Sequence, residues 1–256
     1  MESMNKKEMD DRNHTLVIEG RNAVLEAFRS GKPIDKVFVL DGCQDGPIRT
    51  IVREAKKYDA ILNFVGKDRL NQLSVTGKHQ GVVAYAAAYE YAEVEDMLKL
   101  AKERGEDPFL ILLDNIEDPH NLGAIIRTAN LAGAHGVIIP KRRAVGLTAT
   151  VARTSAGALN YTPVAKVTNL AKTMEELKEK GLWFVCADMG GESMYRLNLT
   201  GPIGLVVGNE GEGVGRLVKE KCDFVAAIPM KGEIDSLNAS VAAGVLAYEI
   251  VRQRLN

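Results

Sequence analysis

The segment 114–130 carries polar side chains that can bind an anion at the start of a helix. Asn121 lies at or just before the first apolar positions of that helix, and Arg127 follows within its first turns. A guanidinium in such a place suits a phosphate or a carboxylate. From these residues alone, Asn121 can equally cap the helix while Arg127 is a solvated charge. The acidic residues and His120 nearby predict no metal site, because no second cluster of ligands completes one.

The glycine-rich segment 208–215 is the second candidate for chemistry, and it follows an apolar run. Gly208 and Gly213 have the spacing of a phosphate-binding P-loop. However, Val214 stands where that motif requires a lysine. Two glutamates inside the segment would repel a phosphate, so a neutral or cationic ligand fits this loop better. A plain glycine-rich turn is the alternative interpretation.

The third candidate is the segment 228–242, where an apolar run ends and the next helix starts. Ser236 or Asn238 can simply cap that helix, which the apolar pattern predicts from 241 to 255. The helix is apolar around much of its circumference. It therefore needs cover from the rest of the domain or from a partner chain.

Short, nearly continuous apolar runs predict an open parallel α/β sheet that positions these segments. Such runs are typical of strands buried on both faces, and a helix such as 170–180 lies between them. In sheets of this kind, ligands bind beyond the carboxyl ends of the strands. The three polar segments are therefore expected at one edge of the sheet. The predicted strands are 109–113, 136–140, 182–187, 203–207 and 224–228.

The composition excludes several classes of protein. The chain has 256 residues, 46% of them hydrophobic and 26% charged, with a formal net charge of −1. These values rule out a disordered tail, a collagen and a disulfide scaffold. They also argue against a protein that coats nucleic acid by overall charge, although a local basic patch remains open. No apolar run is long enough for a membrane span, and three scattered cysteines fit reduced thiols in the cytoplasm.

Composition and apolar pattern divide the chain into four segments. Residues 1–14 are polar and mixed in charge, so we expect a disordered lead-in without the apolar core of a signal peptide. Residues 15–89 show the short α/β pattern of a small domain. Residues 90–107 are expected to form a linker that runs into a helix, and residues 108–256 hold the parallel sheet.

Together, at this order and spacing, the three polar segments resemble the motifs of the SpoU (TrmH-type) branch of the SPOUT methyltransferases. The likeness runs from about Phe109 onward. The N-terminal domain is similar to the L30e-like RNA-binding domain of one subgroup, in part through residues 19–24. The resemblance implies a catalytic domain with a trefoil knot, a rare exception to unknotted chains. It also implies that S-adenosylmethionine is the methyl donor and that the protein is a homodimer with sites at the subunit interface.

The resemblance also implies roles for particular residues. Arg127 would activate a ribose 2′-hydroxyl with help from an RNA phosphate. Because a guanidinium is a poor base at its usual pKa, stabilisation of the developing alkoxide is an equally good physical interpretation. No metal is needed, because the sulfonium is already an activated donor. The implied catalytic residues are Asn121, Arg127, Glu210, Ser236 and Asn238, and the implied cofactor-binding residues are Gly208, Asn209, Gly211, Ile228, Met230 and Leu237.

The function that follows is methyl transfer to a ribose 2′-hydroxyl of RNA, in its most specific form on a guanosine of 23S rRNA. A tRNA 2′-O-methyltransferase and a non-catalytic RNA-binding protein of the same fold are the alternatives. An altered residue at Arg127, Glu210 or Asn238 would favour the latter, and all three match. We expect the RNA phosphates to meet local cations, although a solvated loop is the alternative for them. These cations are Lys141, Arg142, Arg143 and Arg153.

Overall fold

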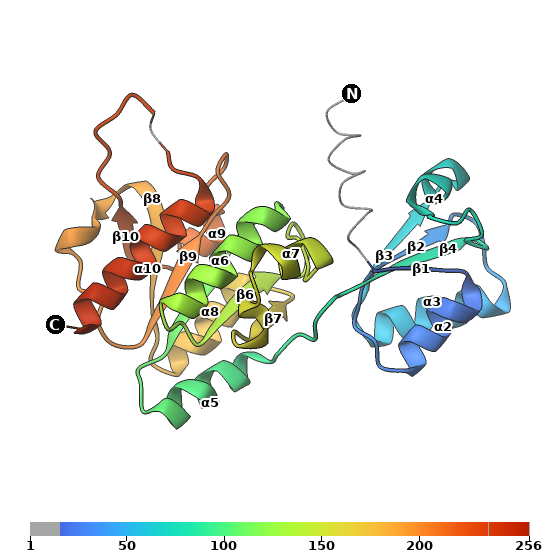
Figure 1. The fold of residues 1–256 in the computed structure, drawn as a ribbon, viewed down its shortest axis with the longest axis horizontal. Coiled ribbons are helices and arrows are strands. Elements are labelled where there is room, and N and C mark those ends of the chain that lie inside the picture. Colours follow the sequence, from blue (N-terminus) through green and yellow to red (C-terminus); the bar gives the residue numbers. More distant parts are fainter. Residues whose placement is uncertain (1–15, 235, 256) are drawn as a thin grey trace. The chain divides into compact units, whose positions relative to one another are not determined.

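The computed structural model describes residues 16–234 and 236–255, and the predicted lead-in 1–14 lies outside them. The chain separates into two compact units (Figure 1). One unit comprises residues up to 90 together with 146–152, and the other comprises 91–145 and 153–256. The boundaries drawn from the sequence remain a prediction.

The first unit is built on a mixed four-stranded sheet in the order β1-β4-β2-β3. Only β2 and β3 are parallel, while β4 pairs antiparallel with both β1 and β2. Helices α2 and α3 contribute Phe28 and Ile51 to a buried core with the sheet, and α4 packs Leu70 on Val83. The elements are β1 (Leu16–Glu19), α2 (Arg21–Arg29), β2 (Ile34–Leu40), α3 (Gly46–Lys57), β3 (Ile61–Val65), α4 (Lys67–Leu73) and β4 (Val82–Ala86).

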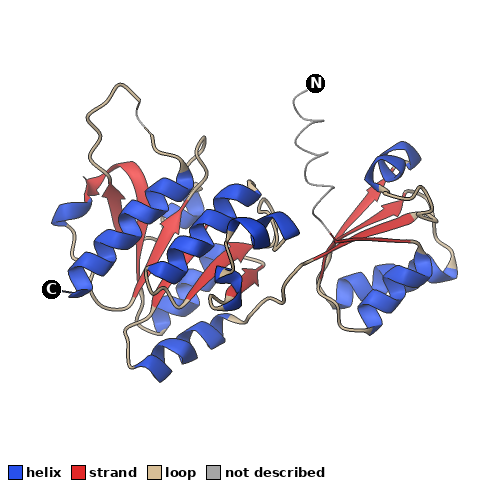
Figure 2. Cartoon of the chain, viewed as in Figure 1, coloured by secondary structure: helices blue, strands red, loops and turns tan. Residues whose placement is uncertain are grey.

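The second unit has a six-stranded sheet in the order β10-β8-β9-β5-β6-β7. Every neighbouring pair is parallel, which confirms the predicted α/β fold class. Figure 2 shows this sheet between helices. Its strands are β5 (Phe109–Leu113), β6 (Gly136–Pro140), β7 (Val164–Val167), β8 (Trp183–Ser193), β9 (Ile203–Val207) and β10 (Phe224–Ala227).

Helices cover both faces of this sheet. Helices α5, α8 and α9 pack on one face through a single buried cluster. The cluster contains one residue from each helix, Met97, Met174 and Val218, and alternate strand residues such as Leu112 and Phe184. Helix α10 packs on α6 and on β9. The elements are α5 (Val94–Arg104), α6 (Pro119–Leu131), α8 (Leu170–Glu179), α9 (Arg216–Lys219) and α10 (Ala239–Leu255), with short 3-10 turns at η1 (Ala158–Asn160) and η2 (Met194–Arg196). Helix α7 (Ala149–Thr154) begins in residues of the first unit and ends in residues of the second.

Helix α5 lies inside the segment 90–107, which the sequence predicts as a linker that runs into a helix. A Cβ atom at Gly136 would sit 2.2 Å from the sulfur of Met97, so α5 lies directly on β6. Met97 and Ala101 are fully buried. The helix is therefore part of the second unit, because its apolar side is needed to cover the sheet.

Two further features differ from the sequence-based expectation. Strand β8 continues to Ser193, beyond the predicted 182–187, with a bulge between two stretches that pair with β10. Helix α6 begins at Pro119 and is capped by Asp118, whose side chain accepts a hydrogen bond from the His120 N–H. The capping role considered for Asn121 is therefore wrong. Proline suits the first helical position, so the helix starts before Asn121.

Candidate functional site

The three predicted segments meet at the carboxyl edge of the parallel sheet. Strands β5 and β9 are neighbours, so Asp114 and Gly208, which follow them, lie side by side. The buried Asp114 carboxylate accepts a hydrogen bond of 2.7 Å from the Gly215 N–H. This bond joins the end of the glycine-rich segment to the end of β5.

The glycine-rich segment is a tightly closed loop. The Asn209 side-chain oxygen accepts hydrogen bonds from the N–H groups of Gly211 at 2.9 Å and Glu212 at 2.6 Å. Gly213 has a φ of +68°, which favours glycine. A Cβ atom at Gly208 would lie 2.1 Å from the Gly213 backbone, so no larger residue fits there. The loop is thus more specialised than a plain turn.

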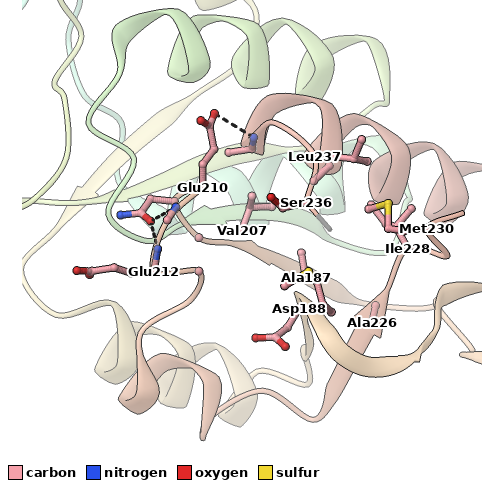
Figure 3. A pocket seen from close by; sticks show the side chains of 17 residues that line it. Ala187, Asp188, Val207, Glu210, Glu212, Ala226, Ile228, Met230, Ser236 and Leu237 are labelled. Carbon is pink, nitrogen blue, oxygen red and sulfur yellow. Dashed lines mark hydrogen bonds between the residues drawn. The ribbon is translucent and has the colours of Figure 1, made fainter. Parts of the chain in front are cut away.

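A polar network joins all three segments through one carboxylate oxygen. Oε1 of Glu210 accepts a hydrogen bond of 2.9 Å from the Asn121 side-chain amide and one from the Asn238 side-chain amide. The Asn238 amide also donates to Oδ1 of Asn121 at 2.9 Å. The Ala239 N–H donates to Oε1 of Glu210 at 3.3 Å, the dashed line from Glu210 in Figure 3. The structure therefore brings together three of the five predicted catalytic residues.

Asn238 serves the helix and the network at the same time. Its Oδ1 accepts hydrogen bonds from the N–H groups of Ser240 at 3.0 Å and Val241 at 3.3 Å, at the start of α10. Its side-chain amide points the other way, to Asn121 and Glu210. The capping interpretation and the functional interpretation of this residue are therefore compatible.

A pocket opens beside this network, and Figure 3 shows its 17 lining residues. All six predicted cofactor-binding residues are among them, together with Glu210 and Ser236. The sequence did not single out the contributions of β8, β10 and α10. Those missed lining residues are Ala187, Asp188, Met189, Ala226, Ala239 and Ala242.

The lining chemistry fits a nucleoside that carries a positive charge. Much of the wall is apolar side chain or glycine backbone, as for Ala226, Ile228 and Gly208. Three carboxylates line the pocket, and none of the described lining residues is a lysine, arginine or histidine. A triphosphate would lack a cation here, whereas a sulfonium would meet favourable charge. The group implied by the resemblance therefore fits these residues.

The predicted cations lie outside the pocket lining. Arg127 is exposed on α6, and within the described part of the chain it makes no hydrogen bond or ion pair. Arg142 and Arg143 are exposed in the loop after β6, where Arg143 has a φ of +55°. Lys141 precedes them, and Arg153 is exposed on α7. The structure thus leaves Arg127 available to a ligand that reaches α6 from solvent.

Comparison with known families assigns both parts of the sequence. A model described as the SpoU rRNA Methylase family matches residues 108–248. A second model, described as RNA 2′-O ribose methyltransferase substrate binding, matches residues 17–92. The chain belongs to the SpoU methylase family. It is therefore a methyltransferase of the SpoU and TrmH type.

Relatives of this SpoU methylase cover nearly the whole chain. A Bacillus subtilis (strain 168) protein, YacO, whose name places it in the TrmH family of tRNA/rRNA methyltransferases, is 52% identical over 94% of this chain and 96% of its own. A TrmH-family relative from Staphylococcus haemolyticus is 47% identical over 93% of this chain and 96% of its own.

Solved structures of SpoU enzymes share the fold. The SpoU methyltransferase AviRb from Streptomyces viridochromogenes, solved in complex with the cofactor AdoMet, superposes with a TM-score of 0.59 and 25% identity over 95% of this chain and 92% of its own. A TrmH/SpoU tRNA modifying enzyme from A. aeolicus gives a TM-score of 0.54 and 28% identity over 63% of this chain and 85% of its own.

The described residues of this SpoU methylase contain neither a candidate metal cluster nor a candidate membrane-spanning helix. Among residues 16–234 and 236–255, no group of three or more His, Cys, Asp or Glu side chains could hold a metal ion. Within the same residues, no helix has the length and apolar character to cross a membrane.

Proposed function

We propose that this SpoU methylase transfers the methyl group of S-adenosylmethionine to a ribose 2′-hydroxyl of RNA. S-adenosylmethionine is the methyl donor of the enzyme. The observation that carries the proposal is the network in which Oε1 of Glu210 accepts from Asn121 and Asn238 beside the pocket. It joins residues of the first and third segments to the loop that lines the pocket, so a bound donor and a nucleophile can meet at one place.

The reaction assigns different tasks to the polar residues. A ribose hydroxyl is a weak nucleophile and must lose its proton as the methyl group approaches. The exposed guanidinium of Arg127 would hold an RNA phosphate and stabilise the alkoxide that develops. Asn121, Glu210, Ser236 and Asn238 would fix the geometry around it, and six lining residues would bind the donor, largely through backbone. Those six are Gly208, Asn209, Gly211, Ile228, Met230 and Leu237.

A guanosine of 23S rRNA is the proposed target. The match of residues 17–92 to a substrate-binding model argues against the minimal tRNA enzymes, which lack such a domain. The A. aeolicus tRNA modifying enzyme covers only 63% of this chain. A tRNA target is the second candidate, because the names of the relatives include both tRNA and rRNA. The phosphates would meet Lys141, Arg142, Arg143 and Arg153.

We extend the proposal to the assembly and location of the enzyme. A homodimer in the cytoplasm is expected, and the exposed apolar side chains of α10 support the dimer. Val241, Tyr248 and Leu255 are 48%, 50% and 81% exposed, and they recur along one stripe of the helix. A second copy of this chain would cover that stripe.

The test is a map of ribose 2′-O-methyl sites in total RNA from cells with and without the protein. We expect one guanosine of 23S rRNA to lose its methyl group in the deletion strain. Wild-type protein should restore the methyl group and Arg127→Ala should not. Loss of a tRNA methyl group instead would support the second candidate. An unchanged map would favour a non-catalytic RNA-binding protein.

A further inference from the structure

The pocket has a wall that none of the three sequence segments contains. Strand β8 pairs with β10 up to Cys186 opposite Val225, and pairing resumes only at Glu192 opposite Ala226. The residues between form a bulge, and Ala187, Asp188 and Met189 line the pocket. Bulges redirect side chains next to functional sites. Here the bulge presents the carboxylate of Asp188 at the pocket.

The Asp188 carboxylate is held in a fixed position. Oδ1 accepts a hydrogen bond of 2.9 Å from the Gly190 N–H in the bulge, and Oδ2 accepts one of 2.7 Å from the ammonium of Lys219. The Lys219 ammonium keeps the pKa of the Asp188 carboxyl below its usual value. The carboxyl group is therefore ionised, and Lys219 balances its charge. Asp188 would accordingly bind a ligand by accepting hydrogen bonds in a fixed direction rather than by net charge.

Asp188 still has acceptor capacity for a ligand. A carboxylate offers about four lone-pair sites, and the two described hydrogen bonds use two of them. Two other oxygens of the lining already accept hydrogen bonds within the loop and the network. Oδ1 of Asn209 accepts two loop N–H groups, and Oε1 of Glu210 accepts the network. Asp188 is thus a preorganised acceptor on the part of the pocket wall that the β8 bulge forms.

The surroundings of Asp188 favour one part of the donor. Figure 3 places Asp188 beside Ala226, on the side of the pocket away from Glu210. Small apolar groups such as Ala226 and Ile228 suit a flat base, and the ribose is bonded directly to that base. A carboxylate that binds vicinal ribose hydroxyls is a general solution in nucleotide sites. We infer that Asp188 accepts hydrogen bonds from the ribose hydroxyls of the bound S-adenosylmethionine.

This inference rests on S-adenosylmethionine occupying the pocket, as the proposed function requires. It is independent of which RNA is methylated, so a wrong RNA target would leave it intact. The competing interpretations of Asp188 are a contact to the ammonium of the methionyl group and a purely structural role in pinning the bulge to α9. Measurements of ligand binding alone distinguish each of these two roles from the proposed contact to the ribose.

Calorimetry with the full chain, without RNA, tests the inference on the wild-type protein first. The probes are S-adenosylmethionine, 5′-methylthioadenosine and the 2′,3′-dideoxy form of the latter. The second probe keeps the ribose hydroxyls but has neither the ammonium nor the sulfonium. We expect the dideoxy form to bind about tenfold more weakly than 5′-methylthioadenosine, as loss of a hydrogen bond to a charged group implies. Equal binding of the two nucleosides would overturn the inference.

Two variants then assign the effect to Asp188. In Asp188→Asn, we expect S-adenosylmethionine and 5′-methylthioadenosine to weaken by a similar factor of about ten, while the dideoxy form is unaffected. Lys219→Gln removes the ion pair but keeps the carboxylate, so its binding should change by less than about threefold. Weakening of S-adenosylmethionine alone would assign Asp188 to the ammonium. Equal weakening in both variants would assign it a structural role, and either result rejects the inference.

Discussion

At the scale of single residues, the site depends on one oxygen atom that several groups share. Oε1 of Glu210 accepts hydrogen bonds from Asn121, Asn238 and the Ala239 N–H. Hydrogen bonds to a charged acceptor are stronger than neutral ones, so this carboxylate holds the network together. The sequence pattern singled out Asn121, Glu210 and Asn238, and the structure brings them together. The pattern could not assign the cap of α6 to Asp118, because Asn121 and Asp118 are both good capping residues.

Arg127→Ala is predicted to fold and to bind S-adenosylmethionine but to lose methyl transfer. The side chain is exposed and lies outside the pocket lining, so its loss creates no cavity. If it stabilises the developing alkoxide, turnover should fall by about 100-fold or more. Single-turnover methylation of RNA, calorimetry and a melting curve measure the three properties.

Lys172→Ala is the matched control for that experiment, because Lys172 is an exposed cation on α8 that forms an ion pair with Glu176. It should leave turnover unchanged. Normal turnover by Arg127→Ala would remove Arg127 from the mechanism.

Asp188 shows what single-residue reasoning could not find. The run from 188 to 193, with two glycines and three polar residues, is typical of a loop after a strand. The bulge that returns the chain to β10 depends on pairing with residues far along the sequence. Alternation and propensity carry no information about such a partner.

At the scale of elements, buried parallel strands were the most predictable part of the fold. The predicted runs 109–113, 136–140 and 203–207 are β5, β6 and β9 as observed, because central strands are continuously apolar. Strand β7 was missed because it has only four residues and includes Lys166. The trefoil knot implied by the resemblance remains a prediction.

Gly208→Ala is predicted to weaken donor binding because the loop cannot close around a methyl group without moving its backbone. The added Cβ would lie 2.1 Å from the Gly213 backbone. Moving the backbone costs about 1–3 kcal/mol, so binding of S-adenosylmethionine should weaken roughly tenfold or more. Calorimetry gives the affinity.

Gly211→Ala is the control in the same loop. Its Cβ would meet only Oδ1 of Asn209, at 3.7 Å. We expect a much smaller loss of affinity than in Gly208→Ala, and equal losses in the two variants would contradict the steric explanation.

His135 is predicted to make the second unit sensitive to mild acid. His135 lies in the turn that joins α6 to β6 in the chain, and its ring is fully buried. Its Nδ1 accepts a hydrogen bond of 3.0 Å from the Phe109 N–H. Burial lowers the pKa of His135 below its usual value of 6.5. As pH falls through 6.5, the unfolded chain binds a proton that the folded chain resists, so the free energy of unfolding decreases.

Thermal melting between about pH 7 and about pH 5.5 measures this effect. His135→Asn does not titrate and can still accept from Phe109. Its melting temperature should fall less over that interval than that of the wild type, whatever its absolute value. Paired carboxyls such as Glu249, whose pKa is lowered by Arg252, titrate at lower pH and leave this interval unaffected. Parallel curves for the two proteins would assign the acid sensitivity elsewhere.

At the scale of the whole molecule, a near-zero net charge coexists with a proposed RNA substrate. The formal charge of −1 means that placed cations, rather than the overall field, must attract the RNA. The small number of such cations, among them Arg142 and Arg143, makes their individual contributions measurable through the salt dependence of binding.

Tyr248→Asp is predicted to convert the proposed dimer into monomers. Tyr248 is half exposed in the middle of the apolar stripe on α10, and a buried charge there would cost about 2 kcal/mol or more at an interface. Light scattering after gel filtration measures the mass. Lys99→Asp places an aspartate on the exposed side of α5, away from the stripe, and should remain dimeric although it changes the net charge more. A wild-type protein that elutes as a monomer would contradict the dimer itself.

The network at the pocket also has a consequence for the order of folding. The Asn121–Asn238 hydrogen bond joins residues 117 positions apart, and the Asn121–Glu210 bond joins residues 89 apart. Contacts of such long range form slowly, because the entropy of closing large loops is lost before any contact is gained. Refolding should therefore restore helix content and the β5–β6 pair early, and the ability to bind the methyl donor last. The binding site is then a sensitive kinetic reporter of the completed fold.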